Sequence, residues 1–245
     1  MQIVKRVFGS KKIDEKLDFD PELLPKHVVL IPDGNRRWAK ERHLPSIEGH
    51  RRGLELAKQL ATACRDWGIR TVSIWAFSTE NWGRAKEEVG YLMKAFDQYL
   101  NDNLKQFIDD GARIRILGRK DRIPKHLLKT IEKVEEMTAK GSEYQLNICL
   151  DYGGRDEIIR AVNGLIKKGK SVTEQVFSDT LDTAGLPDPD FIIRTSGEMR
   201  TSGMMPWQAA YAEYYFSPVY FPDFNVDRLR EAIASFISRQ RRFGK

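Results

Sequence analysis

The residues best suited to chemistry follow short apolar runs, and the first such segment is Asp33–Trp38, which reads DGNRRW. Glycine and asparagine permit an unusual backbone turn, and a helix that starts at Arg36 or Arg37 would direct free N–H groups towards an anion. The two arginines add charged donors for phosphate oxygens. Asp33 would repel that anion unless Mg²⁺ lies between carboxylate and phosphate. The segment predicts a phosphate and magnesium site, and an Asx-type turn that caps a helix is the alternative.

Two further polar segments also follow apolar runs. Phe77–Trp82, with Arg84 shortly after it, offers an amide, a carboxylate and a guanidinium. By itself this segment is equally typical of an ordinary surface loop. Asp151–Arg155 reads DYGGR, and we interpret it as a glycine-rich entry to a helix.

The richest segment is Arg194–Gly203, which reads RTSGEMRTSG directly after the apolar run Phe191–Ile193. Its two arginines and its hydroxyl side chains suit a terminal diphosphate held in one orientation. Farther along the chain, Glu213 lies among aromatic residues, where a carboxylate needs a metal ion or a charged partner. Glu213 is therefore either a metal ligand or a glutamate at the rim of a site that pairs with an arginine.

Together these segments predict two anion sites with one or two carboxylates for magnesium. The stretch Lys86–Asp109 adds a long amphipathic helix whose inward face is apolar. The ligand that fits this combination is an apolar molecule that carries phosphate groups. The residues alone define it no further.

The elements that must position these segments alternate between strands and helices. Short apolar runs predict strands, and longer stretches with apolar residues at helical spacing predict helices. Such alternation is typical of a parallel sheet covered on both faces, in which ligands bind at the carboxyl ends of the strands. No linker divides the chain, so we expect a single α/β domain. The predicted strands are 27–32, 71–77, 113–117, 145–150 and 191–194, and the predicted helices are 49–67, 86–109, 124–139, 156–167 and 226–239.

Composition sets the broad class of protein. The chain has 245 residues, of which 41% are hydrophobic and 31% charged, a balance that excludes predominant disorder. No apolar run reaches the roughly 18 residues that a membrane span needs. The two cysteines cannot form a disulfide-rich scaffold and no cleavable signal is recognisable, so we expect a cytoplasmic protein. The net charge of +6 suits anionic partners: phosphates, nucleic acid or an acidic lipid surface.

Residues 1–25 differ from the rest and are predicted to form an N-terminal arm before a domain that spans 26–245. Ile3, Val4, Val7 and Phe8 lie at helical spacing beside basic residues, a pattern that suits peripheral contact with a membrane. A frayed terminus, or an arm that packs on a partner, is the alternative that we favour.

The motifs resemble those of the cis-prenyltransferases, the undecaprenyl diphosphate synthase family. The resemblance extends from about His27 to the C-terminus, with several separate motifs in the family's order. They read HVVLIPDGNRRWA, GHRRG, AFSTENWGR, DYGGRDEI, PDFIIRTSGEMR, WQAAYAEYYF, FPDF and RQRRFG.

This resemblance implies a fold and an activity. The family fold is a single domain with a central, mostly parallel sheet wrapped by helices, and Lys86–Asp109 would line its hydrophobic tunnel. The implied enzyme is magnesium-dependent and condenses isopentenyl diphosphate onto an allylic diphosphate such as farnesyl diphosphate. Its product would be a long-chain polyprenyl diphosphate such as undecaprenyl diphosphate, a lipid carrier for cell-wall or glycan synthesis.

The resemblance also implies roles for individual residues. Asp33, His50 and Asn81 match catalytic positions, and Asp33 and Glu213 match the acids at the Mg²⁺ site. Glu213 would reach the site across the interface of a homodimer, and Arg242-Phe243-Gly244 matches a C-terminal element that reaches an active site. The positions that match the allylic diphosphate site are Gly34, Asn35, Arg36, Arg37, Trp38 and Arg84, and those that match the isopentenyl diphosphate site are Arg194, Arg200 and Ser202.

The chain departs from the family pattern at positions that flank the isopentenyl diphosphate site. Ser46 stands where the family usually has an arginine, so one of three nearby arginines would have to compensate. Met199 replaces a more polar residue, and Gly203-Met204 begins a segment that usually contains asparagine and phenylalanine. These changes bear on affinity, metal dependence and product length rather than on reaction type. The three arginines are Arg42, Arg51 and Arg52.

Three other functions are compatible with parts of this pattern. A short-chain cis-prenyl diphosphate synthase would carry the same motifs, because a few side chains at the tunnel floor determine product length. A non-catalytic subunit of a heteromeric enzyme would lack the aspartate and arginines, but Asp33, Asn81, Arg194 and Arg200 are all present. A nucleic-acid-binding protein would suit the net charge. Few aromatic residues are interleaved with basic ones outside the motifs, so we expect no nucleic-acid partner.

Overall fold

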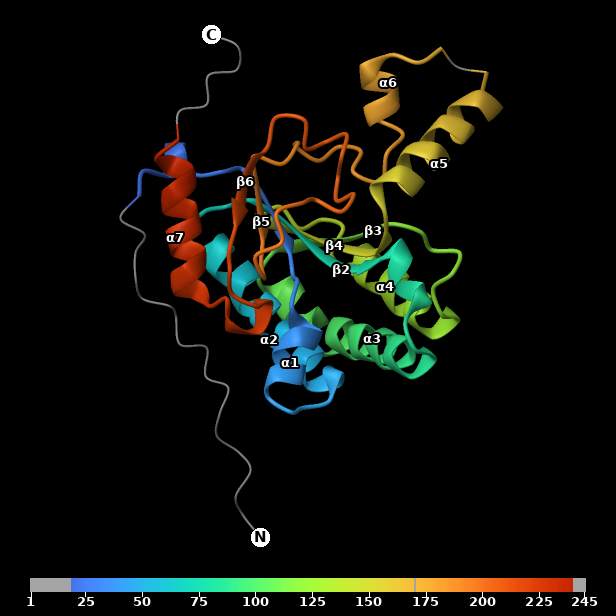
Figure 1. Cartoon of the computed structure of the whole chain (residues 1–245). Helices are drawn as coiled ribbons and strands as arrows, with labels where there is room; N and C mark the ends of the chain where they lie inside the picture. Colours follow the sequence, from blue (N-terminus) through green and yellow to red (C-terminus); the bar gives the residue numbers. More distant parts are fainter. Residues whose placement is uncertain (1–18, 170, 240–245) are drawn as a thin grey trace.

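The computed structural model describes residues 19–169 and 171–239, and its centre is a six-stranded sheet (Figure 1). The strand order is β3-β4-β2-β1-β5-β6, and every neighbouring pair is parallel. This arrangement confirms the predicted single α/β domain. The strands are β1 (His27–Ile31), β2 (Thr71–Ser78), β3 (Ala112–Leu117), β4 (Tyr144–Tyr152), β5 (Phe191–Arg194) and β6 (Glu213–Phe216).

The helices follow the predicted alternation with small differences at their ends. The helix Lys86–Asp109 has the predicted bounds, whereas the preceding long helix begins at Ser46 rather than at Gly49. The helices are α1 (Asn35–Glu41), α2 (Ser46–Asp66), α3 (Lys86–Asp109), α4 (Lys125–Met137), α5 (Gly154–Lys167), α6 (Glu174–Ser178) and α7 (Val226–Ile237), with short 3-10 turns η1 (Pro21–Leu23), η2 (Thr79–Gly83) and η3 (Phe221–Asp223).

The two faces of the sheet are covered differently. Because side chains alternate along a strand, Val28 and Leu30 of β1 face the main core, which α2, α3, α4 and α7 complete. Val29 faces the other way, into a smaller core that contains Met204 and Met205 of the loop before β6. In Figure 1, α5 and α6 lie on the opposite side of the sheet from α1, α2 and α3. A loop therefore covers part of the second face, where the sequence suggested helices.

The strand order brings three loops to one place. β1 lies between β2 and β5, with Ile31 opposite Arg194 in register. Because parallel strands end at the same edge, the segments that follow β1, β2 and β5 meet there. No helix among residues 19–169 and 171–239 has the length and apolarity to span a membrane.

Candidate active site

The loop after β1 turns sharply into α1. Gly34 has a φ of 101°, a left-handed conformation that favours glycine. A Cβ atom at this position would lie 2.6 Å from a ring carbon of Tyr220 and 3.0 Å from Cβ of Ser196, so a larger residue does not fit. The turn expected from the sequence is therefore present, and α1 begins at Asn35, one residue before the earliest predicted start.

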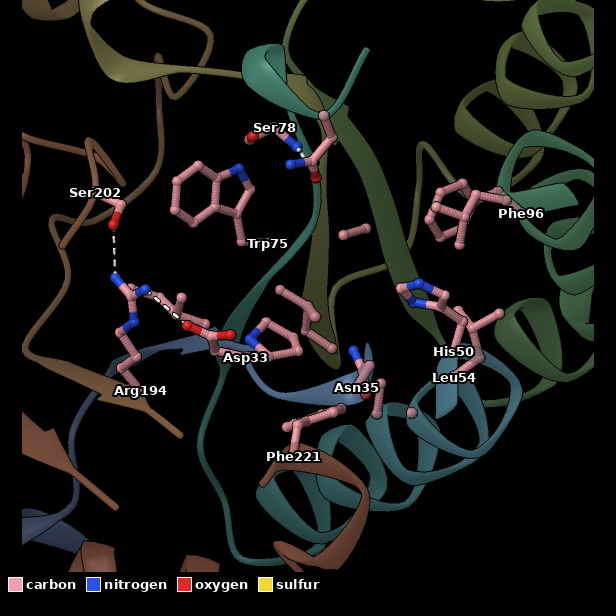
Figure 2. Close-up of a pocket in the computed structure, with 18 of the residues that line it drawn as sticks. Asp33, Asn35, His50, Leu54, Trp75, Ser78, Phe96, Arg194, Ser202 and Phe221 are labelled. Carbon is pink, nitrogen blue, oxygen red and sulfur yellow. Dashed lines mark hydrogen bonds and ion pairs between the residues drawn. The ribbon is translucent and has the colours of Figure 1, made fainter. Parts of the chain in front are cut away.

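The Asp33 carboxylate lies between two guanidinium groups. Its Oδ2 accepts a hydrogen bond from Nη2 of Arg194 at 2.8 Å, which Figure 2 shows, and its Oδ1 accepts one from Nη2 of Arg37 at 3.1 Å. Burial opposes the ionisation of Asp33, but the two arginines outweigh burial and hold its pKa below the ordinary value. Asp33 is thus ionised at neutral pH, with both oxygens bound to cations.

Arg194 connects the loop after β1 to the loop after β5. Its Nη1 donates to Oγ of Ser202 at 2.7 Å, as Figure 2 shows, and it also donates to the carbonyl oxygen of Arg200 at 2.6 Å. The side chain is only 6% exposed, and its Nε is buried with no hydrogen-bond partner among the residues that the structure describes. Arg194 therefore holds Asp33 and Ser202 in a fixed relation.

Glu198 pairs with both outer arginines of the site, and the sequence analysis did not single it out. Its Oε1 accepts from Nη1 of Arg37 at 2.8 Å, and its Oε2 pairs with Arg200. The Arg200 side chain is 59% exposed, so it reaches solvent at the rim of the site. An acid between two arginines, in the motif RTSGEMR, was the available signal for this residue.

His50 lies across a hollow from Asp33 and Arg194 (Figure 2). Its Nε2 is 3.1 Å from Oε1 of Glu88, and the same oxygen accepts a hydrogen bond from Arg84 at 3.0 Å. Burial lowers the pKa of His50 even though Glu88 opposes this, so the imidazole is neutral at neutral pH. Because a carboxylate can only accept, Nε2 carries the proton and Nδ1 is the basic nitrogen. Sequence analysis missed Glu88, although it lies one helical turn after Arg84.

Asn81 lies in η2, directly after β2. Its Oδ1 accepts from the backbone N–H of Ser78 at 3.1 Å, which fixes the orientation of the amide. The next residue, Trp82, donates from Nε1 to the buried carboxylate of Asp151 at 2.8 Å, and Asp151 also pairs with Arg122. The carboxyl end of β4 therefore anchors the loop that carries Asn81.

Two adjoining hollows meet at Asp33, and they differ in chemistry. The smaller, of about 280 Å³, has an apolar side formed largely by α2 and α3. The larger, of about 750 Å³, is lined by cationic groups and by the turn into α1. Asp33, Asn35, His50 and Arg84 line both hollows; Leu54, Ala57, Leu92 and Phe96 line only the smaller, and Arg36, Arg37, Lys40 and His43 only the larger.

The predicted diphosphate residues are distributed over these hollows with two exceptions, Trp38 and Arg200. Arg194, Asn81 and Ser202 line the smaller hollow, and Gly34 lines the larger together with the α1 arginines. Arg200 lies outside both linings and pairs with Glu198. Trp38 also lines neither hollow, and its Nε1 donates to Asp223 of η3 at 2.8 Å instead.

Glu213 does not lie beside Asp33 in the same chain. It begins β6 and is opposite Phe191, the first residue of β5, whereas Asp33 follows the other end of the sheet. Its carboxylate pairs with Arg239 at 2.9 Å. Within one chain, Glu213 is thus the arginine-paired glutamate of the alternative interpretation. The segment 242–244 lies outside the described residues.

The arginine that Ser46 replaces has no substitute among the three expected residues. Ser46 lines the larger hollow, but none of those arginines does, and Lys40 and His43 line it instead. Each expected arginine pairs with an acid elsewhere: Arg42 with Asp223, Arg51 with Glu48 and Glu55, and Arg52 with Glu55. Nearby, Met199 is largely exposed, and Met204 is buried against the sheet.

The acids of one chain fit a magnesium ion only if the substrate supplies further ligands. Among the described residues, no group of three or more His, Cys, Asp or Glu side chains is placed to hold a metal ion. Mg²⁺ commonly binds through one or two carboxylates together with phosphate oxygens and water. Asp33 is an ionised oxygen donor at the junction of two arginine-lined hollows, and it fits a Mg²⁺ ion bound together with a diphosphate.

Known proteins show the same combination of sequence and fold. A family model described as "Putative undecaprenyl diphosphate synthase" matches residues 31–244. The isoprenyl transferases of Bacillus cereus and Neisseria meningitidis are 42% and 44% identical, over 90% and 91% of this chain and 88% and 90% of their own.

Two crystal structures resemble the whole fold. Lavandulyl diphosphate synthase from Lavandula x intermedia, in complex with dimethylallyl diphosphate, has a TM-score of 0.87 at 33% identity, covering 91% of this chain and 100% of its own. A probable undecaprenyl diphosphate synthase from Campylobacter jejuni has a TM-score of 0.77 at 32% identity, covering 90% and 99%. The family match includes all three loops that meet at Asp33. The chain therefore belongs to the undecaprenyl diphosphate synthase family and is a prenyltransferase.

Proposed function

We propose that this enzyme condenses isopentenyl diphosphate onto an allylic diphosphate, such as farnesyl diphosphate, in a Mg²⁺-dependent reaction. The observation that carries the proposal is the position of Asp33, an ionised carboxylate where a cationic hollow meets a partly apolar one. Two diphosphates need two groups of cationic donors, and an isoprenoid tail needs an apolar wall. The structure of lavandulyl diphosphate synthase holds dimethylallyl diphosphate, an allylic diphosphate, in a similar fold.

In this proposal, the larger hollow binds the allylic diphosphate. Arg36, Arg37 and Arg84 donate to its oxygens and stabilise the negative charge that grows as the bond from carbon to oxygen breaks. The hydrocarbon tail lies in the smaller hollow against Leu92 and Phe96, which exclude water from the reacting carbon.

The loop after β5 binds isopentenyl diphosphate through Arg194, Arg200 and Ser202. The terminal double bond of isopentenyl diphosphate then faces the allylic carbon. A new carbon–carbon bond forms there as the bond from that carbon to oxygen breaks and the diphosphate group leaves. A proton from the isopentenyl unit must also leave to create the new cis double bond. His50 and Asn81 line the same hollow, and the basic Nδ1 of the neutral imidazole is suited to assist that proton transfer.

Asp33 would hold Mg²⁺ together with phosphate oxygens. Bound there, the ion would neutralise charge on the departing diphosphate. For Asp33 to take this role, Arg37 and Arg194 must exchange its carboxylate for phosphate oxygens. The two arginines would then move from an internal acid to the substrate.

We also propose a homodimer in which Glu213 of a second copy contributes to the metal site. Ile159 and Ile166 of α5, and Tyr211 just before β6, are large apolar side chains left exposed in the single chain. A contact that covers Tyr211 would lie two positions from Glu213 in the sequence. Sedimentation at several concentrations tests the dimer, and mixing Glu213→Ala chains with Asp33→Ala chains tests whether the two residues act from different copies.

The product is proposed to be a long-chain polyprenyl diphosphate such as undecaprenyl diphosphate, a lipid carrier for cell-wall or glycan synthesis. A short-chain synthase is the second candidate, because the similarity to lavandulyl diphosphate synthase is high. We place the catalytic domain at residues 26–245 and the enzyme in the cytoplasm, where its two buried free cysteines would stay reduced. Peripheral contact with a membrane through the N-terminal arm is part of this proposal.

Incorporation of labelled isopentenyl diphosphate onto farnesyl diphosphate tests the function, with Mg²⁺ and with EDTA. We expect products that form only with Mg²⁺ and that chromatography resolves as a long cis series. If only short products form, the second candidate replaces the first. If folded protein yields no product with any allylic primer, the proposal is wrong and a subunit that needs a partner becomes the better interpretation.

A further inference from the structure

The short segment between β6 and η3 joins the two loops that are proposed to bind diphosphate. The carbonyl oxygen of Val219 accepts a hydrogen bond from the backbone N–H of Ser196, in the loop after β5, at 2.6 Å. The backbone N–H of Phe221 donates to the carbonyl oxygen of Asp33, in the loop after β1, at 2.9 Å. Tyr220 lies between these two hydrogen bonds, so both loops fix the position of its backbone. The turn η3, which follows directly, lies beside α1 in Figure 1.

The side chain of Tyr220 packs against α1 and the turn that precedes it. A Cβ atom on Gly34 would lie only 2.6 Å from Cδ1 of the ring, so the ring meets the backbone of this turn directly. The hydroxyl of Tyr220 donates to Oε1 of Glu41 at 2.5 Å. The guanidinium carbon of Arg37 lies over the ring, 5.5 Å from its centroid. Because Arg37 and Glu41 are four positions apart, they lie on the same side of α1, and the ring extends across both.

We propose that Tyr220, anchored by Glu41, is a positioning residue that holds the Arg37 guanidinium in the orientation in which it binds the allylic diphosphate. The inference rests on the proposed condensation reaction, in which Arg37 leaves carboxylates for phosphate oxygens. The N–H donors of a guanidinium lie in its plane, so contact with the face of a ring uses none of them. The attraction to the ring therefore persists while the acceptors of Arg37 change.

The exposure of Arg37 is the reason that such a support matters. Its side chain is 43% exposed, and its acceptors Asp33 and Glu198 are the groups that phosphate must replace. Without the ring, Arg37 would lose its contacts at the moment of exchange and would give up rotamer freedom again when it binds phosphate. With the ring in place, part of that loss of freedom has already occurred before the substrate arrives.

The test measures the binding of farnesyl diphosphate without isopentenyl diphosphate, so that no turnover takes place. Calorimetric titration gives the Kd for each variant. Tyr220→Leu removes the ring, and we expect its Kd to rise by about twofold to thirtyfold, the range that corresponds to one cation–π contact. Tyr220→Phe keeps the ring face and should show a smaller rise. Neither variant should change the KM for isopentenyl diphosphate, which Arg37 is not proposed to bind.

A double-mutant cycle separates positioning from a general loss of structure. If Tyr220 acts through Arg37, Tyr220→Leu should have little further effect on the Kd once Arg37 is replaced by alanine. A defect in the fold of the Gly34 turn would instead weaken binding by the same factor whether or not Arg37 is present. Additive effects of the two substitutions would therefore overturn the inference.

Glu41 provides a second variant on the exposed surface of α1, where a substitution leaves folding intact. Glu41→Ala frees the Tyr220 hydroxyl and should raise the Kd, whereas Glu41→Gln keeps an acceptor and should restore the wild-type value. Tyr91→Leu is the matched control, because it removes the ring of a half-buried tyrosine that lines neither hollow. Its Kd should equal that of the wild-type enzyme.

A wild-type Kd in either Tyr220→Leu or Glu41→Ala would overturn the inference, and Glu41→Ala decides the question if Tyr220→Leu does not fold. The proposed reaction fails in a different way. A wild-type enzyme that binds farnesyl diphosphate but does not condense it with isopentenyl diphosphate would refute the condensation reaction itself.

Discussion

Asp33 and Arg194 form an ion pair of 2.8 Å although 161 positions separate them in the sequence. They meet because β1 and β5 are adjacent parallel strands in which Ile31 is opposite Arg194. Asp33 therefore follows the end of one strand at the point where Arg194 ends the next. The acid of DGNRRW and the first arginine of RTSGEMRTSG therefore belong to one structural unit.

Replacing Asp33 with alanine should abolish turnover and leave the fold intact. Arg194 would lose one acceptor but would keep two, the hydroxyl of Ser202 and the carbonyl of Arg200. We expect the condensation rate to fall by at least about a hundredfold, the usual effect of removing one group that stabilises charge in a transition state. Asp33→Asn is the matched variant, since it keeps shape but not charge. Retained turnover in either, with unchanged circular dichroism, would remove Asp33 from the metal site.

Arg200→Ala should chiefly raise the KM for isopentenyl diphosphate. The side chain is exposed and its ion pair is with Glu198, so its removal should not affect folding. Losing a charged hydrogen bond to phosphate should raise this KM by about tenfold to a hundredfold. Steady-state kinetics with each substrate varied in turn measure this effect. The KM of Arg200→Lys should lie between those of the wild-type enzyme and of Arg200→Ala. An unchanged KM would show that Arg200 does not contact this substrate.

His27 should make the stability of the fold depend on pH. Its Nδ1 lies 2.8 Å from the carbonyl of Pro187 and therefore carries the proton, so Nε2 accepts from the hydroxyl of Ser73. Burial lowers its pKa from 6.5 to about 4. The unfolded chain thus takes up the proton first as the pH falls.

The stabilisation that the neutral His27 side chain provides is complete above pH 6.5 and is lost as the pH falls from that value to about pH 4. The loss amounts to about 3 kcal/mol of unfolding free energy. Urea denaturation at several pH values measures it, and His27→Gln, which does not titrate, should show a correspondingly flatter profile. If the unfolding free energy of the wild-type protein and that of His27→Gln fall equally between pH 6.5 and about pH 4, His27 is not the group responsible.

Asp151 should affect both stability and turnover through Trp82. Asp151 is fully buried and has a φ of 52°, which asparagine also tolerates. Asp151→Asn keeps an acceptor for Nε1 of Trp82 but loses the ion pair with Arg122. We expect its free energy of unfolding to fall by about 1 kcal/mol. Asp151→Ala loses both the hydrogen bond from Trp82 and the ion pair with Arg122, so its free energy of unfolding should fall by about 3 kcal/mol.

Both Asp151 variants should lower kcat, because Trp82 adjoins Asn81. Trp82→Phe removes the same hydrogen bond from the other side, so a double-mutant cycle with Asp151→Ala should show strong coupling. Additive effects of the two substitutions would argue that the loop is anchored differently.

The sequence predicted the elements that have a strong local signal and missed those that lack one. Lys86–Asp109 and Phe191–Arg194 have the expected bounds, because a long amphipathic repeat and a short apolar run after proline and aspartate are strong local signals. The helix Glu174–Ser178 has too few residues to show a period. The strand Glu213–Phe216 is half-buried throughout at the edge of the sheet, so its side chains do not alternate in polarity.

The residues of the site also divide into those with a strong signal in the sequence and those without one. Motifs after the strands predicted Asp33 and Arg194, since parallel strands bring their carboxyl ends together. Glu88 and Glu198 were missed because an acid in the first turn of a helix, or beside arginines in a loop, is common on ordinary surfaces. Only the tertiary structure shows their partners. Sequence position also could not tell whether Glu213 reaches the site of its own chain.

The pairing of Arg37 with two acids has a consequence for product release. In the absence of substrate, Asp33 and Glu198 occupy donors of Arg37 that the proposed reaction assigns to phosphate. After condensation these carboxylates are intramolecular competitors of the bound diphosphate, always present at the same short range. In the proposed reaction they would weaken substrate binding and would also speed the departure of the diphosphate leaving group. The enzyme would then bind its substrate less tightly but return sooner to the state that starts the next cycle.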